Sequence, residues 1–206
     1  MKVNRRDFIK FSLLSLLFVL TGGKYRHRRK AEGMKDGFIR PPGAIVEDDF
    51  VYQCVRCSEC IKVCPAECLV SVSLSEGLVE WGTPKVLPRK AGCIRCMACG
   101  MVCPSGAIQR VKEDEVKMGT AKINRKRCLV WEYDKDCLVC LEFCPAGAIY
   151  VDFKGRPVVS PSKCVGCGIC EENCPVMGEA AIRVFVNGEK RFELKRNLKT
   201  GGGKNV

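Results

Sequence analysis

Cysteine is the residue type in this 206-residue chain whose number and spacing could do chemistry. The chain has 17 cysteines, and sixteen of them fall into four short runs. Three runs share one spacing: three cysteines stand three positions apart, a fourth follows four positions later, and proline comes next. In the third run the first cysteine lies nine positions before the second. The runs are Cys54, Cys57, Cys60 and Cys64; Cys93, Cys96, Cys99 and Cys103; Cys128, Cys137, Cys140 and Cys144; and Cys164, Cys167, Cys170 and Cys174.

The shared spacing, C-x2-C-x2-C-x3-C-P, is a ligand pattern of [4Fe–4S] clusters. Three closely spaced cysteines let one tight loop offer three thiolates to one cluster. The fourth cysteine ligates the other cluster of a pair, and the proline fixes the backbone at the turn. The four runs therefore predict four [4Fe–4S] clusters, with all sixteen cysteines as ligands.

Other uses of cysteine fit the spacing less well. Triplets at such short intervals are poorly placed for disulfides, and zinc sites favour separated C-x2-C pairs. Cys68 is left over, four residues after Cys64, and we interpret it as a small buried apolar residue rather than a ligand. His27 is the single histidine and lies in a basic stretch, so we do not expect it to be a ligand.

The net charge of +12 is concentrated near the N-terminus. Residues 1–40 hold 11 Lys/Arg and 3 Asp/Glu, whereas residues 41–206 hold 24 and 20. A [4Fe–4S] cluster with four thiolates carries about −2, so four clusters would bring residues 41–206 from +4 to about −4. The basic composition is therefore no argument for nucleic-acid binding, which depends on Lys/Arg contacts to phosphates.

Residues 1–40 are interpreted as an export signal and a basic linker. Arg5 and Arg6 precede Phe8-Ile9-Lys10 and an apolar stretch, Phe11–Leu20, which is typical of a twin-arginine (Tat) signal. A spanning helix needs about 20 apolar residues, so we expect no transmembrane anchor. The basic stretch Lys24–Lys30 fits either attachment to an anionic membrane surface or a solvated linker. The Tat translocase, which carries folded proteins, is an expected partner.

Residues 41–194 are predicted to form the cluster-binding domain, and the basic, Gly-rich residues 195–206 a disordered tail. Apolar stretches after the cysteine runs predict strands and hairpins. The sequence thus predicts an α+β fold with two ferredoxin-like halves of two clusters each, small and cluster-stabilised, with short helices and β-hairpins. The predicted strands are 69–74, 106–111 with a return strand at 120–123, 148–152 with 157–159, and 181–186 turning toward 190–194.

Two questions stay open at this point. The runs, at 54–64, 93–103, 128–144 and 164–174, could share clusters as neighbours, one with two and three with four. They could also nest, with one and four around two and three.

The extra residues of the third run include Trp131 and Tyr133, which either shield a cluster from water or fill a gap. The apolar pairs Ala107-Ile108, Ala148-Ile149 and Ala181-Ile182 are expected to cover clusters.

Several features together resemble the NapG/MauM family of ferredoxin-type proteins: the twin-arginine start, Arg40-Pro41-Pro42-Gly43-Ala44-Ile45, Cys54-Val55-Arg56-Cys57, Met118-Gly119 and the stretched run from Cys128. The resemblance implies a periplasmic electron-transfer subunit attached to the outer face of the inner membrane. It also implies that a polytopic iron–sulfur membrane protein, acting as a quinol dehydrogenase, supplies the electrons. The acceptor would be a c-type cytochrome or a periplasmic reductase such as nitrate reductase.

The sequence predicts no catalytic site of its own. It shows no Rossmann glycine motif, no P-loop and no histidine placed as a base, so enzyme activity would belong to a complex. Two alternatives remain. The protein could be the relay subunit of another respiratory oxidoreductase, such as a hydrogenase or a molybdopterin enzyme, or a MauM-like maturation factor.

Overall fold

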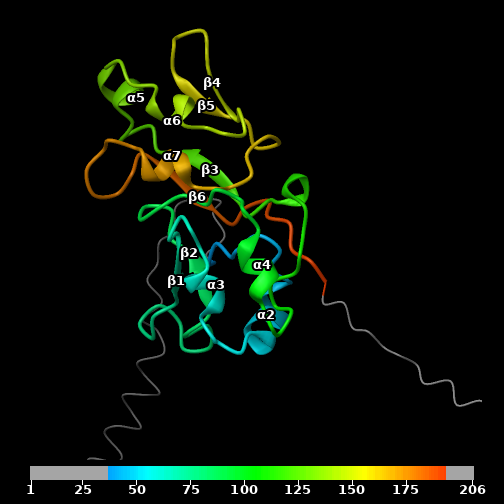
Figure 1. Ribbon diagram of the computed structural model, residues 1–206. Coiled ribbons are helices and arrows are strands. Elements are labelled where there is room, and N and C mark those ends of the chain that lie inside the picture. The colour runs from blue at the N-terminus through cyan, green and yellow to red at the C-terminus, as the bar shows by residue number, and fades with distance from the viewer. Residues whose placement is uncertain (1–36, 194–206) are drawn as a thin grey trace, which may run out of the picture. The chain divides into compact units, whose positions relative to one another are not determined.

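The computed structural model describes residues 37–193 (Figure 1). The predicted export signal, nearly all of the basic linker, and the predicted tail lie outside these described residues. No helix within residues 37–193 is long and apolar enough to cross a membrane. The helices are α2 Glu47–Gln53, α3 Glu59–Lys62, α4 Ala98–Val102, the 3-10 helix η1 Glu113–Glu115, α5 Leu129–Tyr133, α6 Val139–Glu142 and α7 Ile169–Glu172; the strands are β1 Leu69–Ser71, β2 Pro84–Val86, β3 Thr120–Ile123, β4 Ile149–Val151, β5 Pro157–Val159 and β6 Ile182–Phe185.

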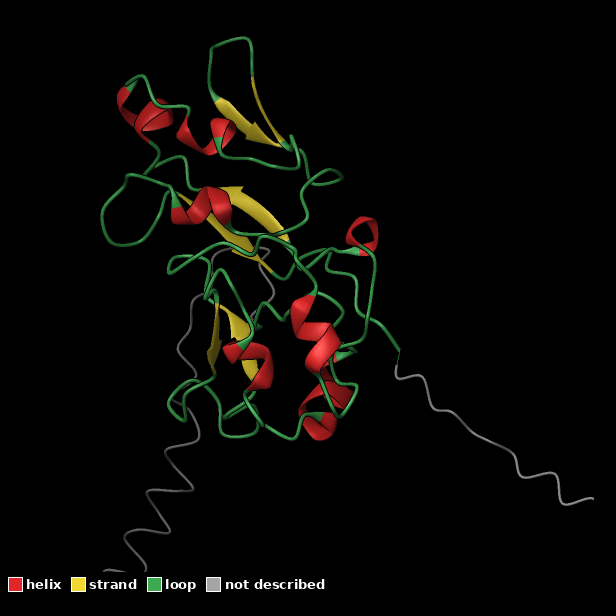
Figure 2. Cartoon of the chain, in the orientation of Figure 1, coloured by secondary structure: helices red, strands yellow, loops and turns green. Residues whose placement is uncertain are grey.

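The described chain consists of two halves that repeat one plan. In the second half, β3 pairs antiparallel with β6, and the hairpin β4–β5 lies between them in the sequence. In the first half, the hairpin β1–β2 lies between Ala44 and Ile108, which form an antiparallel bridge. Figure 2 shows the same short helices and two-stranded sheets in both halves. The predicted α+β fold with two ferredoxin-like halves is confirmed.

The strands predicted at 120–123 and 181–186 are present as β3 and β6, but the partners predicted for them are wrong, whereas the predicted local hairpin is right. The hairpin predicted at 148–152 and 157–159 is present as β4–β5. Residues 106–111 do not pair with 120–123; only the bridge of Ile108 with Ala44 forms there. Residues 182–185 pair with β3 rather than with 190–194. The reason is that the first and last strands of a half must meet, so a distant partner replaces the neighbour in sequence.

The core follows the cysteine runs. The alanine of each predicted covering pair is buried, with 1–3% of its surface exposed in Ala107, Ala148 and Ala181. The isoleucines that follow them are buried too. Cys68 and Leu69 stand at the corresponding place after the first run and are also buried. The apolar core therefore consists of alanines and larger aliphatic residues packed around the cysteines.

The lead-in segment, residues 40–45, is part of the first half. Ile45 N–H donates to the Ala107 carbonyl at 3.1 Å. The Arg40 side chain is buried, bonds both Glu47 carboxylate oxygens and donates to Thr83 Oγ1 at 2.8 Å. Ile45 also forms a parallel bridge with Phe192.

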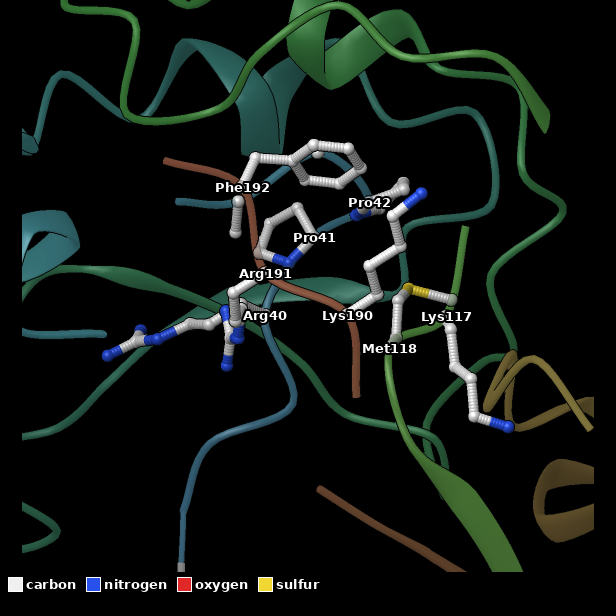
Figure 3. Close-up of a pocket in the computed structure, with 10 residues that line it drawn as sticks. Arg40, Pro41, Pro42, Lys117, Met118, Lys190, Arg191 and Phe192 are labelled. Carbon is white, nitrogen blue, oxygen red and sulfur yellow. The ribbon is translucent and has the colours of Figure 1, made fainter. Parts of the chain in front are cut away.

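A hollow without cysteines lies between the lead-in and the C-terminal segment (Figure 3). Its arginines are held by ion pairs with Glu47, and Lys117 donates to the carbonyl of Cys164 at 2.9 Å. We therefore interpret this basic hollow as structural.

Candidate metal centres

The sixteen predicted ligands line four hollows of similar size, with empty volumes of about 310 to 360 Å³, open solvent included. Three cysteines in each hollow come from one run, and the fourth is the last cysteine of another run. We name the hollows sites A to D. Site A has Cys54, Cys57, Cys60 and Cys103; site B has Cys93, Cys96, Cys99 and Cys64; site C has Cys164, Cys167, Cys170 and Cys144; site D has Cys128, Cys137, Cys140 and Cys174.

The sites answer the pairing question that the sequence left open. Run one exchanges its fourth cysteine with run two, and run three with run four, so neighbouring runs pair. The nested arrangement would require Cys174 beside the first run, but Cys174 lines site D with Cys128. The folding reason is that the ends of each half meet, through Ala44 and Ile108 in one half and β3 and β6 in the other.

The three regular runs share an unusual backbone. The two residues that flank the middle cysteine have positive φ angles, which non-glycine residues rarely adopt. Alternating right- and left-handed conformations turn successive N–H groups into a concave nest, a feature of many Fe–S sites. The third run departs from this, because Leu138 has a φ of −124°. The residues with positive φ are Arg56, Ser58, Arg95, Met97, Gly166 and Gly168.

Backbone N–H groups reach three of the fourth cysteines. Ile108 N lies 3.4 Å from Cys103 Sγ, Ala148 N 3.3 Å from Cys144 Sγ, and Ala181 N 3.4 Å from Cys174 Sγ. Such donors stabilise a negatively charged thiolate and tune a bound cluster. At the remaining fourth cysteine, Cys64, the sulfur contact is with Cys68 Sγ at 3.6 Å.

The thiols are held where they resist ionisation without a metal. Burial, with the crowding of other thiols, raises the pKa of Cys60, Cys99 and Cys140 to about 12 each. Contact with the Cys68 thiol instead lowers the pKa of Cys93 from its usual value. Bound iron would supply the positive charge that the buried thiolates lack, so metal binding displaces their protons.

The donor set fits a cluster better than a single ion. Within residues 37–193, no three His, Cys, Asp or Glu side chains lie close enough together to hold one metal ion. A zinc site needs its sulfurs about 2.3 Å from one centre. Four thiols placed around a hollow instead suit a core of several atoms.

A junction that the sequence did not predict joins sites B and C. The N–H of Cys93 donates to the carbonyl of Cys167 at 2.7 Å. Arg95 lies at this junction; its charge lowers the pKa of both cysteines, although burial raises that of Cys167 overall. Arg95 pairs with Glu113 at 3.0 Å, and its Nε is buried without a protein partner. In the sequence, the only indication of this role was a cationic residue inside a cysteine run.

A second arginine, Arg89, also forms hydrogen bonds between the two halves. Arg89 donates to the carbonyls of Glu171 and Cys174 at 2.9 Å each and of Val176 at 2.7 Å. It thus satisfies carbonyls at the end of α7 that would otherwise lack partners. Arg89 follows no recognisable motif, so sequence reasoning missed it.

The aromatic residues of the third run do not shield a cluster from water, and Trp131 instead anchors this run to the β4–β5 hairpin. The indole N–H of Trp131 donates to the Pro157 carbonyl at 3.0 Å, and Arg125 stacks on its ring at 4.2 Å. Leu129, not Trp131, lines site D, and Tyr133 is exposed. His27 lies outside the described residues.

Comparison with known proteins agrees with this geometry. Two family models described as 4Fe-4S dicluster domains match, one at residues 53–108 and the other at 92–148 and 135–177. The 92–148 match joins runs two and three, which line separate sites here; the similar spacing of the repeats explains it. The chain therefore carries 4Fe-4S dicluster domains and, with them, up to four [4Fe–4S] clusters.

Curated relatives cover most of the chain. The methylamine utilization ferredoxin-type protein MauM of Methylorubrum extorquens is 37% identical over 178 residues, 80% of this chain and 76% of the relative. MauM of Paracoccus denitrificans is 34% identical over 217 residues, 98% and 92% of the two chains. The ferredoxin-type protein NapG of Escherichia coli is 34% identical over 196 residues, 87% and 82%. The chain belongs to the family of the MauM and NapG ferredoxin-type proteins.

Proposed function

We propose that the protein relays electrons through four [4Fe–4S] clusters, ligated at sites A to D by the sixteen cysteines. When bound, each cluster supplies one-electron exchange. The observation that carries the proposal is the continuous series of contacts between sites. α3 with Cys60 contacts α4 with Cys99, and α6 with Cys140 contacts α7 with Cys170.

The junction between the halves completes the series. The hydrogen bond from Cys93 to Cys167 puts the ligand loops of sites B and C in direct contact. The supported order is therefore A, B, C, D, with sites A and D at the ends. The chain's own residues position the ligands, exclude water with small apolar side chains and hold positive charge at the middle step.

Exposed aromatic side chains lie in both halves. Tyr52 lies in the last turn of α2, just before Cys54 of site A. Trp81 lies near the same site, because Arg56 donates to the Trp81 carbonyl at 2.8 Å. Phe153 and Tyr150 belong to the β4–β5 hairpin of the second half. Aromatic residues are enriched at protein–protein interfaces. They support docking of an electron donor and an electron acceptor to the two halves.

Family membership and the N-terminal pattern support a proposal for the donor and the acceptor. We propose a periplasmic protein, attached to the outer face of the inner membrane and exported by the Tat translocase. A membrane quinol dehydrogenase with iron–sulfur centres would donate electrons. A c-type cytochrome or a periplasmic reductase such as nitrate reductase would accept them. Support comes from Arg5 and Arg6 before a short apolar stretch and from relatives named NapG.

The test is turnover in membranes from a strain that lacks the gene. Purified, oxidised protein is added back anaerobically with a quinol, and cluster bleaching is followed by absorbance. The proposal predicts bleaching that depends on the membranes, followed by reoxidation when the acceptor is added. Absence of quinol-dependent bleaching, with intact clusters, would contradict it. Replacing Arg5 and Arg6 by lysine should keep the protein in the cytoplasm.

The resemblance to MauM-like proteins leaves a second candidate, a maturation factor. A maturation factor would bind an immature enzyme transiently and need no steady quinol-dependent turnover. The two functions differ in a deletion strain. If the protein is a relay, the terminal enzyme stays active with an artificial electron donor. If it is a maturation factor, the enzyme is inactive with every donor.

A further inference from the structure

Comparison of the four repeats shows one residue, Cys68, whose side-chain type is not explained by packing. In each repeat, a small buried side chain follows the Cys-Pro turn in the sequence. It lines the site to which the fourth cysteine of that run contributes. Three repeats use alanine there, at Ala107, Ala148 and Ala181, and the first uses Cys68. All four are nearly inaccessible, with exposures of 1–3%. Because alanine fills the place in three repeats, the sulfur of Cys68 is an addition to a position that needs only a small residue.

The added sulfur points into site B. Cys68 lines that hollow together with all four predicted ligands, so five thiols surround one site. Its Sγ lies 3.6 Å from Cys64 Sγ, within the range of a sulfur hydrogen bond. The fourth cysteines of the other sites each accept a backbone N–H instead. Site B thus has a side-chain S–H where the other sites have a main-chain donor.

We propose that Cys68 is a positioning residue whose thiol donates a hydrogen bond to a ligating sulfur of site B, that of Cys64 or that of Cys93, and raises the reduction potential of the cluster there. The inference rests on the proposed function, because it needs a cluster at site B. Iron keeps both ligands as thiolates, which can accept, and a thiol S–H is a weak donor. A hydrogen bond to a ligating sulfur favours the reduced, more negative cluster.

The consequence for the relay follows from the place of site B. It stands directly before the junction with site C, where Cys93 meets Cys167. A raised potential at site B holds an electron there, on the side of the first half. Cys68 would then set which half is reduced first.

The experiment uses the full-length protein, purified anaerobically with its clusters, and an EPR-monitored redox titration. Cys68→Ala should keep the iron content of the wild type and move one midpoint to lower potential. Cys68→Ser, which keeps a donor, should move it less. In a Cys96→Ser background, which removes the cluster of site B, Cys68→Ala should leave the remaining midpoints unchanged.

A matched variant tests the same contact at another site. Ala148→Cys places a thiol at the equivalent position beside Cys144 and should raise one midpoint, a different one from that lowered by Cys68→Ala. Unchanged midpoints in both variants would overturn the inference, and so would loss of one cluster's iron in Cys68→Ala, which would make Cys68 a ligand. A wild-type protein without four clusters would overturn the proposed function instead.

Discussion

At the scale of single residues, the chemistry depends on which thiols share a site. The spacing predicted all sixteen cysteines as ligands, and the structure brings them together in four groups of four. The spacing could not decide between neighbouring and nested runs, because either gives each fourth cysteine a partner. The decision comes from strand pairing between distant residues, such as Thr120 with Phe185.

Because each site takes cysteines from two runs, two substitutions at the same site should remove only one cluster. Cys54→Ser and Cys103→Ser each damage site A, so the double variant should lose about four iron atoms per chain, the content of one cluster. Cys54→Ser combined with Cys96→Ser should lose about eight, because two sites are damaged. Iron analysis of anaerobically purified protein measures both. If Cys54→Ser with Cys174→Ser loses only one cluster, the nested arrangement is correct.

Replacing Arg95 should change the reduction potentials of nearby clusters without removing a cysteine ligand. Its charge lies near Cys93 and Cys167, and a nearby cation favours the reduced cluster. Arg95→Gln should therefore lower the potentials of the clusters at sites B and C, by roughly 1 kcal/mol each at the effective dielectric of a protein surface. Redox titration measures the shift. Lys154→Gln, in the exposed hairpin turn, is the control and should shift neither.

At the scale of elements, Gly166 of the fourth run allows its ligand loop to pack closely on the segment that leads into β3. A Cβ on Gly166 would lie 2.5 Å from the backbone nitrogen of Gly119, and Met118 N–H donates to the Val165 carbonyl at 2.9 Å. This contact gives a structural reason for the Met118-Gly119 pair that the sequence displayed. Sequence reasoning found the β4–β5 hairpin from its local turn but missed β3–β6, whose partners lie about 60 residues apart.

Gly166→Ala should therefore weaken site C more than strain alone explains. Gly166 and Gly106 both have positive φ, at 75° and 73°, so alanine costs about 1–2 kcal/mol at either place. Only Gly166 adds a steric clash, worth about 1–3 kcal/mol more. The rate of cluster bleaching on mild heating compares the two variants. Equal rates for Gly166→Ala and Gly106→Ala would show that the close approach to Gly119 does not matter.

At the scale of the whole molecule, the described chain has elements of three to seven residues and an apolar core packed around its cysteines. Helices this short are not stable on their own, and the core encloses the thiols that would hold the clusters. We therefore expect folding and cluster binding to be coupled. Composition and spacing predict a cluster-stabilised fold, whereas the order of the sites was not predictable, because it depends on contacts such as Arg89 with the end of α7.

Removing the clusters should unfold the protein. Anaerobic treatment with an iron chelator and an oxidant is expected to abolish most ordered secondary structure, as followed by circular dichroism. Iron, sulfide and a reductant should restore it. A chain that keeps its full spectrum after losing its iron would show that the apolar core is sufficient without the clusters.

Anaerobic iron and acid-labile sulfide analysis, combined with EPR of the dithionite-reduced protein, tests whether the protein is a relay of four clusters. Four [4Fe–4S] clusters predict about sixteen iron and about sixteen sulfide per chain, with S = 1/2 signals broadened by interaction between neighbouring clusters. Zinc in place of iron, or iron for only one or two clusters, would break the series from site A to site D and contradict the claim.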